Sequence, residues 1–469
     1  MTRKLFISLL AFCIIPAFSI NPVEKFVNNP VLQHANVGLL VKNLNTGETL
    51  YELNPDNSRT TASTMKAITT ATALEMFGPD YRIETKLAID GELLSDSTLE
   101  GNLYIVGGGD PSLGSEKTGD KNFLDTWVKA VRKAGIKNIN GKIIVDASVF
   151  DKQVINPKWS WEDMGNYYAP GIHGISYMDN TYKMFLKSGK AGTTTELLRT
   201  EPEIPELNIE NLVKSAAISS DNAYFYGAPF SDYRYVTGEI PANRAEFVVK
   251  GDIPNPGLLL AQHFHTKLAE AGSIISAEPE VIYDNCCKKL VIYKHLSPPL
   301  SELITETNIK SNNHYAEYLF KLIGSKFSSP ATNDAAKKNI ELFWQKKGLP
   351  TDELFQYDGS GLSACNAVSP RFFVDMLTYM KRDSKYANTY FKSLPIAGVS
   401  GTLKEILGKT RLEGKVHAKS GTIQNVKCYV GYIEQSNKTL VFALMVNEPN
   451  GASKEVVKKM EEFFLDITK

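Results

Sequence analysis

The stretch TTASTMKAITTATALEMFGPD, residues 60–80, begins as a threonine-rich turn and ends at Gly78-Pro79. Between these ends the residues are nearly all Ala, Met, Ile, Leu and Thr, a composition that predicts a buried helix. Gly followed by Pro is a usual helix stop. The first turn nevertheless carries Ser63 and Lys66, which stand three positions apart and therefore lie on one face of the predicted helix.

A hydroxyl beside a buried amine is a candidate for nucleophilic catalysis. A Ser hydroxyl reacts poorly until a base removes its proton. An exposed Lys, with a pKa of about 10.4, is protonated at neutral pH, but burial in an apolar helix lowers that pKa and favours the neutral amine. The pattern therefore predicts Ser63 as nucleophile and Lys66 as its base. A Ser that caps the helix beside a Lys lying along the surface is the alternative, because about two Ser-x-x-Lys matches are expected by chance.

A Ser-Lys acyl enzyme also needs a second hydroxyl that relays a proton, and a cation beside an edge strand that holds the substrate. The chain offers each motif twice: Ser-Asp-Asn at 220–222 and Ser-Asn-Asn at 311–313, then Lys-Ser-Gly at 187–189 and at 419–421. The first copies lie in β-like runs and turns, which favours turn chemistry. The second copies lie where a loop enters an amphipathic helix and beside a strong β-run, so we expect the second copies to be functional.

Strand patterns occur at both ends of the chain. Residues 36–56 predict two strands around a turn, and residues 425–447 predict two more, followed by a helix over 453–468. We expect one antiparallel sheet built from both termini and flanked by helices, an α/β (α+β) fold, with residues 20–80 and 286–469 forming the catalytic domain. Short β-runs between Gly- and Pro-rich turns fill residues 81–285, which predict a large, mainly β insertion of two subdomains.

Composition excludes some functions. The 469 residues include 52 Lys plus Arg and 52 Asp plus Glu, so no nucleic-acid partner is expected. The seven His residues are scattered without ligand spacing, so neither a metal nor a cofactor is predicted. His314 lies beside the second motif, and a contact between it and substrate is the weaker alternative.

The N-terminal segment predicts export. Residues 1–19 combine a basic start, an apolar run and small residues at a cleavage-type spacing, which is typical of a signal peptide, and the run is too short for a membrane span. We therefore expect a mature chain without a transmembrane anchor, secreted across the inner membrane to the periplasm. The last helix has an apolar face, which we expect to pack on the sheet; loose membrane association through that face is the minor alternative.

The three motifs, in this order, resemble those of the serine penicillin-recognising enzymes. The long insertion narrows the resemblance to the low-molecular-mass class C penicillin-binding proteins, the D-alanyl-D-alanine carboxypeptidase/endopeptidase family. Similar motifs cover nearly the whole mature chain: GNLYIVGGGDPSLG at 101–114, WSWEDMGNYYAPGIHGISYMDN at 159–180, HLSPPLSELI at 295–304, DGSGLS at 358–363, PIAGVSGTL at 395–403 and HAKSGT at 417–422.

The resemblance implies catalytic roles. Ser63 would form the acyl-enzyme and Lys66 would deprotonate it, while Ser311 would pass a proton to the leaving D-Ala nitrogen. The backbone N–H groups of Ser63 and Thr422 would form the oxyanion hole.

The resemblance also implies substrate contacts and partners. Asn313 would bind the substrate amide, Lys419 would hold the proton relay electrostatically, and Ser420 and Thr422 would meet the terminal carboxylate. The expected substrates are peptidoglycan stem peptides, cut at their D-Ala-D-Ala ends or also at the D-Ala cross-links, and β-lactam antibiotics would be covalent inhibitors. The family pattern is not matched everywhere, since Asn312 replaces the usual Asp, Ser420 the commoner Thr, and Ala364 a frequent Arg.

Two rival functions remain at this point. A β-lactamase would share the acylation step but would need a base for the hydrolytic water. A non-catalytic peptidoglycan-binding scaffold on the same fold would need none of the hydroxyls and amines that the motifs contain.

Overall fold

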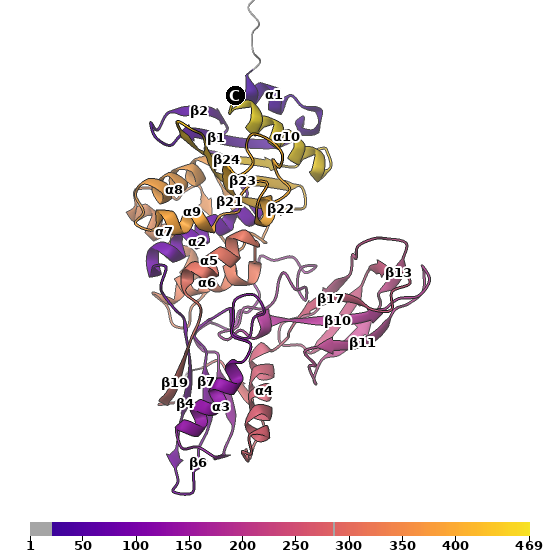
Figure 1. Ribbon diagram of the computed structural model, residues 1–469, viewed down its shortest axis with the longest axis vertical. Helices are drawn as coiled ribbons and strands as arrows, with labels where there is room; N and C mark the ends of the chain where they lie inside the picture. The colour runs from indigo at the N-terminus through magenta and orange to yellow at the C-terminus, as the bar shows by residue number, and fades with distance from the viewer. Residues whose placement is uncertain (1–20, 285–286) are drawn as a thin grey trace, which may run out of the picture.

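A computed structural model of the protein describes residues 21–284 and 287–469, so the predicted signal peptide lies outside the described residues. The chain forms a helix-flanked sheet region at one end and a β-rich region at the other (Figure 1). Within residues 21–284 and 287–469, no helix combines the length and the apolar character needed to cross a membrane.

The main sheet joins the two ends of the chain, as the sequence predicts. Its strand order is β2-β1-β24-β23-β22, with every pair antiparallel. The strands are β2 (Thr49–Leu53), β1 (Asn36–Asn43), β24 (Thr439–Asn447), β23 (Val426–Glu434) and β22 (Val416–Ile423). The first strand thus lies in the sheet beside the last, and β22, which carries the third motif, forms an edge.

Helices cover both faces of this sheet (Figure 1). They are α1 (Pro22–Val27) and α10 (Ser453–Asp466) on one face, and α2 (Met65–Phe77), α5 (Leu300–Ile309), α6 (Asn313–Ser325), α7 (Asn333–Lys346), α8 (Pro370–Arg382) and α9 (Ala387–Ser393) on the other side. Successive residues of a strand point to opposite faces. Accordingly Phe442 of β24 packs in one core with Phe463 of α10, and Ala443 packs in the other core with Ile68 of α2. The apolar face of the last helix is therefore packed on the sheet.

Helix α2 is the buried helix that the Thr60–Asp80 stretch predicts. Its residues from Met65 to Leu74 are all buried, and it ends at Gly78, whose φ of 84° lies in the left-handed region that Gly favours. One difference concerns the first turn: Ala62–Thr64 form a short 3₁₀ segment, η2, before the α-helix begins. Ser63 therefore lies in this tighter turn, directly ahead of α2.

The middle region is mainly β, as predicted. A five-stranded sheet has the order β18-β9-β7-β4-β19, and α3 (Phe123–Lys133) and α4 (Pro256–Glu270) pack on it. Its strands are β18 (Glu280–Ile282), β9 (Ile143–Asp146), β7 (Leu103–Val106), β4 (Glu84–Ile89) and β19 (Leu290–Leu296). Because β19 pairs with β4, this sheet extends beyond residue 285. The division of the chain at residues 80 and 285 stays a prediction.

Smaller sheets extend sideways from this region (Figure 1). Their strands are β10 (Thr181–Lys187), β11 (Glu196–Glu201) and β17 (Phe247–Asp252); β12 (Asn208–Asn211), β15 (Tyr233–Thr237) and β14 (Tyr224–Tyr226); and β13 (Lys214–Ala216) with β16 (Glu239–Pro241). These strands are three to seven residues long, and none belongs to the main sheet.

Candidate active site

The amine of Lys66 lies at the centre of the candidate site. Its Nζ is 2.9 Å from Ser63 Oγ, 2.6 Å from Asn313 Oδ1 and 2.7 Å from the carbonyl oxygen of Ser360. The Ser63 contact is local, since the 3₁₀ turn leads directly into the first turn of α2. The other two contacts come from α6 and from the loop after β20 (Leu354–Phe355), so three separate segments of the chain meet at one amine.

Burial sets the protonation state of this amine. The Lys66 side chain is fully buried, and loss of hydration lowers its pKa to about 7, although the negative charges of Glu317 and Asp358 act in the opposite direction. A neutral amine has two hydrogens and one lone pair. Because Asn313 Oδ1 and the Ser360 carbonyl can only accept, they take both hydrogens, and the lone pair is left for the Ser63 hydroxyl. This geometry can accept a proton from Ser63.

The second motif occupies the entry to α6. Ser311 has a φ of 56°, an unusual value for a residue other than Gly, and the Asn312 side chain caps the helix by accepting from Tyr315 N at 3.3 Å. An Asp, which the family pattern usually has at this position, can cap a helix in the same way, so Asn312 preserves that role. Asn313 Nδ2 donates to the carbonyl of Tyr168 at 2.9 Å, which orients its Oδ1 toward Lys66.

The third motif lies on the edge strand β22. Lys419 is fully buried, and its Nζ donates to Ser311 Oγ at 3.0 Å and to the Ser420 carbonyl at 2.8 Å. Burial lowers the pKa of Lys419 well below its usual value, and the nearby Lys66 lowers it further. The hydroxyl of Ser420 bonds Thr402 Oγ1 at 2.7 Å, and Lys427 Nζ donates to Thr422 Oγ1 at 2.7 Å. Strand β22 thus brings a buried amine and two hydroxyls to the site.

Gly421 lets this strand pass against the nucleophile turn. A Cβ at this position would lie 2.5 Å from the Thr61 carbonyl oxygen, closer than real Cβ atoms lie, and a tight 3.1 Å from Ser63 N. The glycine in Lys-Ser-Gly is therefore required by the approach of β22 to η2. The same approach brings the backbone of Ser63 beside Gly421, the residue before Thr422.

The DGSGLS turn holds the third contact of Lys66. The carboxylate of Asp358 accepts from Gly361 N and Ser363 N, both at 2.7 Å, and from Trp159 Nε1 at 3.0 Å. Burial raises the pKa of Asp358, whereas these donors lower it. The turn is thereby fixed so that the Ser360 carbonyl faces Lys66.

Glu317 is a site residue that sequence reasoning missed. Its buried carboxylate accepts from Gly359 N at 3.1 Å and from Ser360 N at 2.7 Å, and burial raises its pKa. A signal was present, because Glu317 follows Asn313 by four positions and thus lies on the same face of α6.

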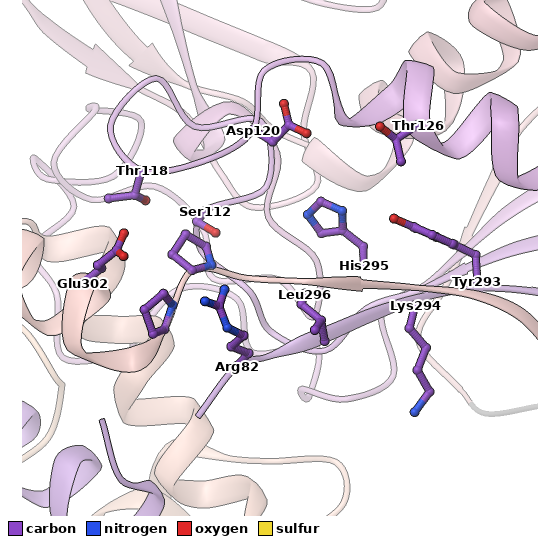
Figure 2. A pocket seen from close by; sticks show the side chains of 12 residues that line it. Arg82, Ser112, Thr118, Asp120, Thr126, Tyr293, Lys294, His295, Leu296 and Glu302 are labelled. Atoms are coloured by element: carbon purple, nitrogen blue, oxygen red, sulfur yellow. The ribbon is translucent and has the colours of Figure 1, made fainter. Parts of the chain in front are cut away.

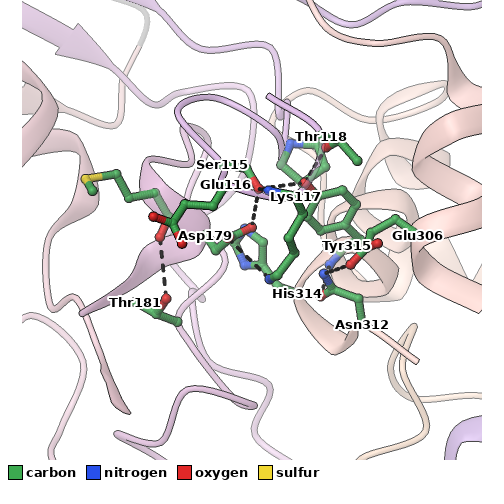
Figure 3. A network of polar contacts seen from close by, with 12 residues as sticks. Ser115, Glu116, Lys117, Thr118, Asp179, Thr181, Glu306, Asn312, His314 and Tyr315 are labelled. Atoms are coloured by element: carbon green, nitrogen blue, oxygen red, sulfur yellow. Dashed lines mark hydrogen bonds and ion pairs between the residues drawn. The ribbon is translucent and has the colours of Figure 1, made fainter. Parts of the chain in front are cut away.

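A cleft of about 560 Å³ opens beside the second motif. Its walls come from both regions of the chain: Ser311, Asn313 and His314 on one side, and Lys117, Tyr168 and Asp179 among the residues on the other. Figure 3 shows part of this wall, a polar network in which Ser115 bonds both Tyr315 and Asp179 and Lys117 pairs with Asp179 at 3.3 Å.

The His314 ring is buried and bonded to the protein. Its Nε2 lies 2.9 Å from Ser176 Oγ, and burial lowers its pKa well below the usual value, so the ring is neutral. A contact between His314 and substrate, the weaker alternative from sequence, stays untested.

A second cavity and the other motif copies lie away from the candidate site. A cavity of about 530 Å³ between β19 and the start of α5 is lined by residues such as Arg82, Asp120 and His295, and no predicted site residue lines it (Figure 2). In the first Lys-Ser-Gly copy, Ser188 Oγ donates to the Pro241 carbonyl at 2.6 Å, in a turn after β10. In the first Ser-Asp-Asn copy, Asn222 accepts from Glu239 N. Both copies act as turn residues, as the sequence predicts.

Comparisons with known proteins agree with this architecture. The model of the D-Ala-D-Ala carboxypeptidase 3 (S13) family matches residues 20–466. A D-alanyl-D-alanine carboxypeptidase of Actinomadura sp. (strain R39) is 28% identical over 444 residues, which are 92% of this chain and 81% of the relative. The D-alanyl-D-alanine carboxypeptidase DacB of Haemophilus influenzae is 24% identical over 419 residues, or 88% of this chain and 85% of the relative.

A solved structure shares the fold. The crystal structure of penicillin binding protein 4 from Haemophilus influenzae matches with a TM-score of 0.81 and 22% identity, covering 96% of this chain and 100% of that one. The same protein has also been solved in complex with a β-lactam. The expected α+β fold, with its large insertion, is therefore shown.

Proposed function

Because the chain belongs to the D-Ala-D-Ala carboxypeptidase 3 (S13) family and is thus a serine-type D-Ala-D-Ala carboxypeptidase, we propose that Ser63 is its nucleophile. Ser63 attacks the carbonyl carbon of the penultimate D-Ala of a peptidoglycan stem peptide and holds the peptide as an ester. The observation that carries this proposal is the set of three contacts of Lys66 Nζ, two with oxygens that can only accept and one with Ser63 Oγ.

In the acylation step one proton crosses the site. Lys66 takes the proton of Ser63 as the Oγ–C bond forms, and the backbone N–H groups of Ser63 and Thr422 stabilise the oxyanion. Ser311, hydrogen-bonded to Lys419, gives its proton to the D-Ala nitrogen as the C–N bond breaks. The proton that Lys66 took from Ser63 then passes to Ser311 Oγ, so that both Lys66 and Ser311 return to their starting protonation states. Water then hydrolyses the ester.

Substrate binding uses the edge strand and the second motif. The Ser420 and Thr422 hydroxyls and the nearby Lys427 suit the terminal carboxylate of the substrate, and Asn313 suits its amide. The cleft beside Asn313 supports endopeptidase action as well, because it offers space for a second stem peptide joined through a D-Ala cross-link. The N-terminal sequence supports action in the periplasm.

A β-lactam would acylate Ser63 through the same steps, but its opened ring does not depart. The two carboxylates whose charges act on Lys66, Glu317 and Asp358, are both occupied by backbone N–H groups. This occupation supports slow hydrolysis of the ester and disfavours the β-lactamase alternative.

Release of D-Ala from a soluble stem pentapeptide tests the proposal. We expect release by the wild-type protein, none by Ser63→Ala, and a large loss in Ser420→Ala, while Ser188→Ala in the other Lys-Ser-Gly copy retains full activity. A cross-linked stem dimer, assayed in parallel, reports endopeptidase action. D-Ala release that survives in Ser63→Ala would refute the assignment of the nucleophile, and no release by wild type would favour the scaffold alternative.

A further inference from the structure

One face of the small β12-β15-β14 sheet is covered with tyrosines. Along β14 and β15 the side chains alternate, as they must in strands. Phe225, Arg234 and Val236 point inward and are buried. The residues between them point outward, and they are Tyr224, Tyr226, Tyr233 and Tyr235, of which Tyr224 is 43% and Tyr233 41% exposed.

These rings form a row together with a tryptophan. Tyr226 pairs with Tyr235 across the strands, and their rings stack with centroids 4.8 Å apart. Trp161, 50% exposed, stands 6.4 Å from Tyr226 at one end, and Tyr233 stands 6.4 Å from Tyr235 at the other. We call these four rings with Tyr224 the aromatic face. Exposed aromatic surface of this kind marks a binding site more often than a structural need.

The aromatic face is held rigidly from behind. Arg234, on the inward side of β15, forms a buried ion pair with Asp252 at 2.8 Å, and its guanidinium also donates to the Ser231 carbonyl. A rigid face loses little entropy when a ligand binds it, which favours recognition.

Polar groups border the aromatic face. Glu210 of β12 lies opposite Tyr235 in the sheet register, and its carboxylate accepts from the Tyr233 hydroxyl. Glu162, next to Trp161 in the chain, is exposed. Rings bordered by carboxylates and phenol hydroxyls suit a ligand that has both C–H faces and hydroxyl or amide groups.

One loop connects the aromatic face to the cleft. The Asn166 side chain donates to the Phe225 carbonyl at 3.1 Å and accepts from Phe225 N at 3.0 Å, which ties the loop after Trp161 to β14. Two residues further along the same loop, Tyr168 lines the cleft and accepts from Asn313. One loop therefore spans from Trp161 to the candidate active site.

We propose that the aromatic face binds the glycan strand of peptidoglycan, a neutral polymer of N-acetylated hexosamines, while the stem peptide attached to that strand enters the cleft. The pyranose ring offers C–H groups that pack on aromatic rings, and its hydroxyl and amide groups meet the carboxylates and phenols. The proposal rests on the proposed function for the identity of the polymer, because the cleft would receive a peptide that is carried by this glycan.

Calorimetric titration with a soluble oligomer of β-linked N-acetylglucosamine tests the proposal. We expect the wild-type protein to bind the oligomer. The double variant Trp161→Ala/Tyr233→Thr should bind it with an affinity at least about tenfold lower. Because Trp161 lies outside the strands, the single variant Trp161→Ala provides the readout if the double variant does not fold. The matched control is Phe327→Ala, which removes an aromatic ring that is 70% exposed and lies outside the aromatic face.

Activity assays separate this proposal from the proposed function. We expect the double variant to release D-Ala from a free stem pentapeptide as fast as wild type does, but more slowly from intact sacculi. Ser63→Ala should bind the oligomer normally, so failure of the catalytic proposal would leave this binding in place. The glycan proposal is overturned if wild type does not bind the oligomer, if Phe327→Ala weakens binding equally, or if the double variant loses activity on the free pentapeptide.

Discussion

The pH dependence of acylation tests the protonation state of Lys66. The ammonium form of this side chain cannot accept the Ser63 proton, so the acylation rate constant should follow the fraction of neutral amine. Because burial lowers the pKa of Lys66 to about 7, that fraction rises as pH rises through neutrality.

The expected change is large enough to measure. With a pKa of about 7, roughly a tenth of the amine is neutral at pH 6 and roughly nine tenths at pH 8, which gives an acylation rate constant about tenfold higher at pH 8. Below pH 6 the rate constant should fall about tenfold for each unit of pH. A Lys with its ordinary pKa would instead show a midpoint near 10.5.

Stopped-flow mixing with a fluorescent penicillin across this pH range measures the rate constant directly. Lys66→Arg is the control, since a guanidinium stays protonated throughout and should not support acylation at any of these pH values. A profile that is flat between pH 6 and 8, or one whose midpoint lies near 10, would refute the argument that buried, neutral Lys66 is the base.

Other substitutions test single contacts. Gly421→Ala places a Cβ 2.5 Å from the Thr61 carbonyl, so β22 must shift, and we expect at least about tenfold slower acylation in the same assay with little change in melting temperature. Ser311→Ala removes the proton relay and should lower D-Ala release by about 10²- to 10⁴-fold, whereas Ser220→Ala should not; equal activities would contradict the relay. Asp358→Ala leaves buried N–H groups unpaired at about 1–3 kcal/mol each, so chemical denaturation should show a clear loss of stability.

The motifs could be found from sequence because each depends on local structure. Ser63 and Lys66 are neighbours wherever residues 63–66 are helical, and that helix is evident from its composition. The Lys-Ser-Gly copy that lies at the candidate site could be chosen because Lys419 lies in a strong β-run. The hydroxyl of Ser420 and the cap formed by Asn312 show that the departures from the family pattern keep the local chemistry.

The remaining contacts depend on tertiary structure and leave little trace in the sequence. The Ser360 carbonyl and the Tyr168 carbonyl act through the backbone, which has no residue signature. Trp159 donates to Asp358 although the two residues are 199 positions apart in the chain. The 3₁₀ turn around Ser63 differs from the predicted α-helix because Ala62, with a φ of 45°, enters it from the left-handed region.

The intact mass of the protein after mixing with benzylpenicillin is the most direct test of Ser63 as an acylable nucleophile. We expect the wild-type mass to increase by one penicillin and to stay increased, and the mass of Ser63→Ala to remain unchanged. An adduct that forms on Ser63→Ala, or no adduct on the wild-type protein, would contradict the central claim. An adduct that forms and disappears within seconds would contradict the slow hydrolysis and favour a β-lactamase.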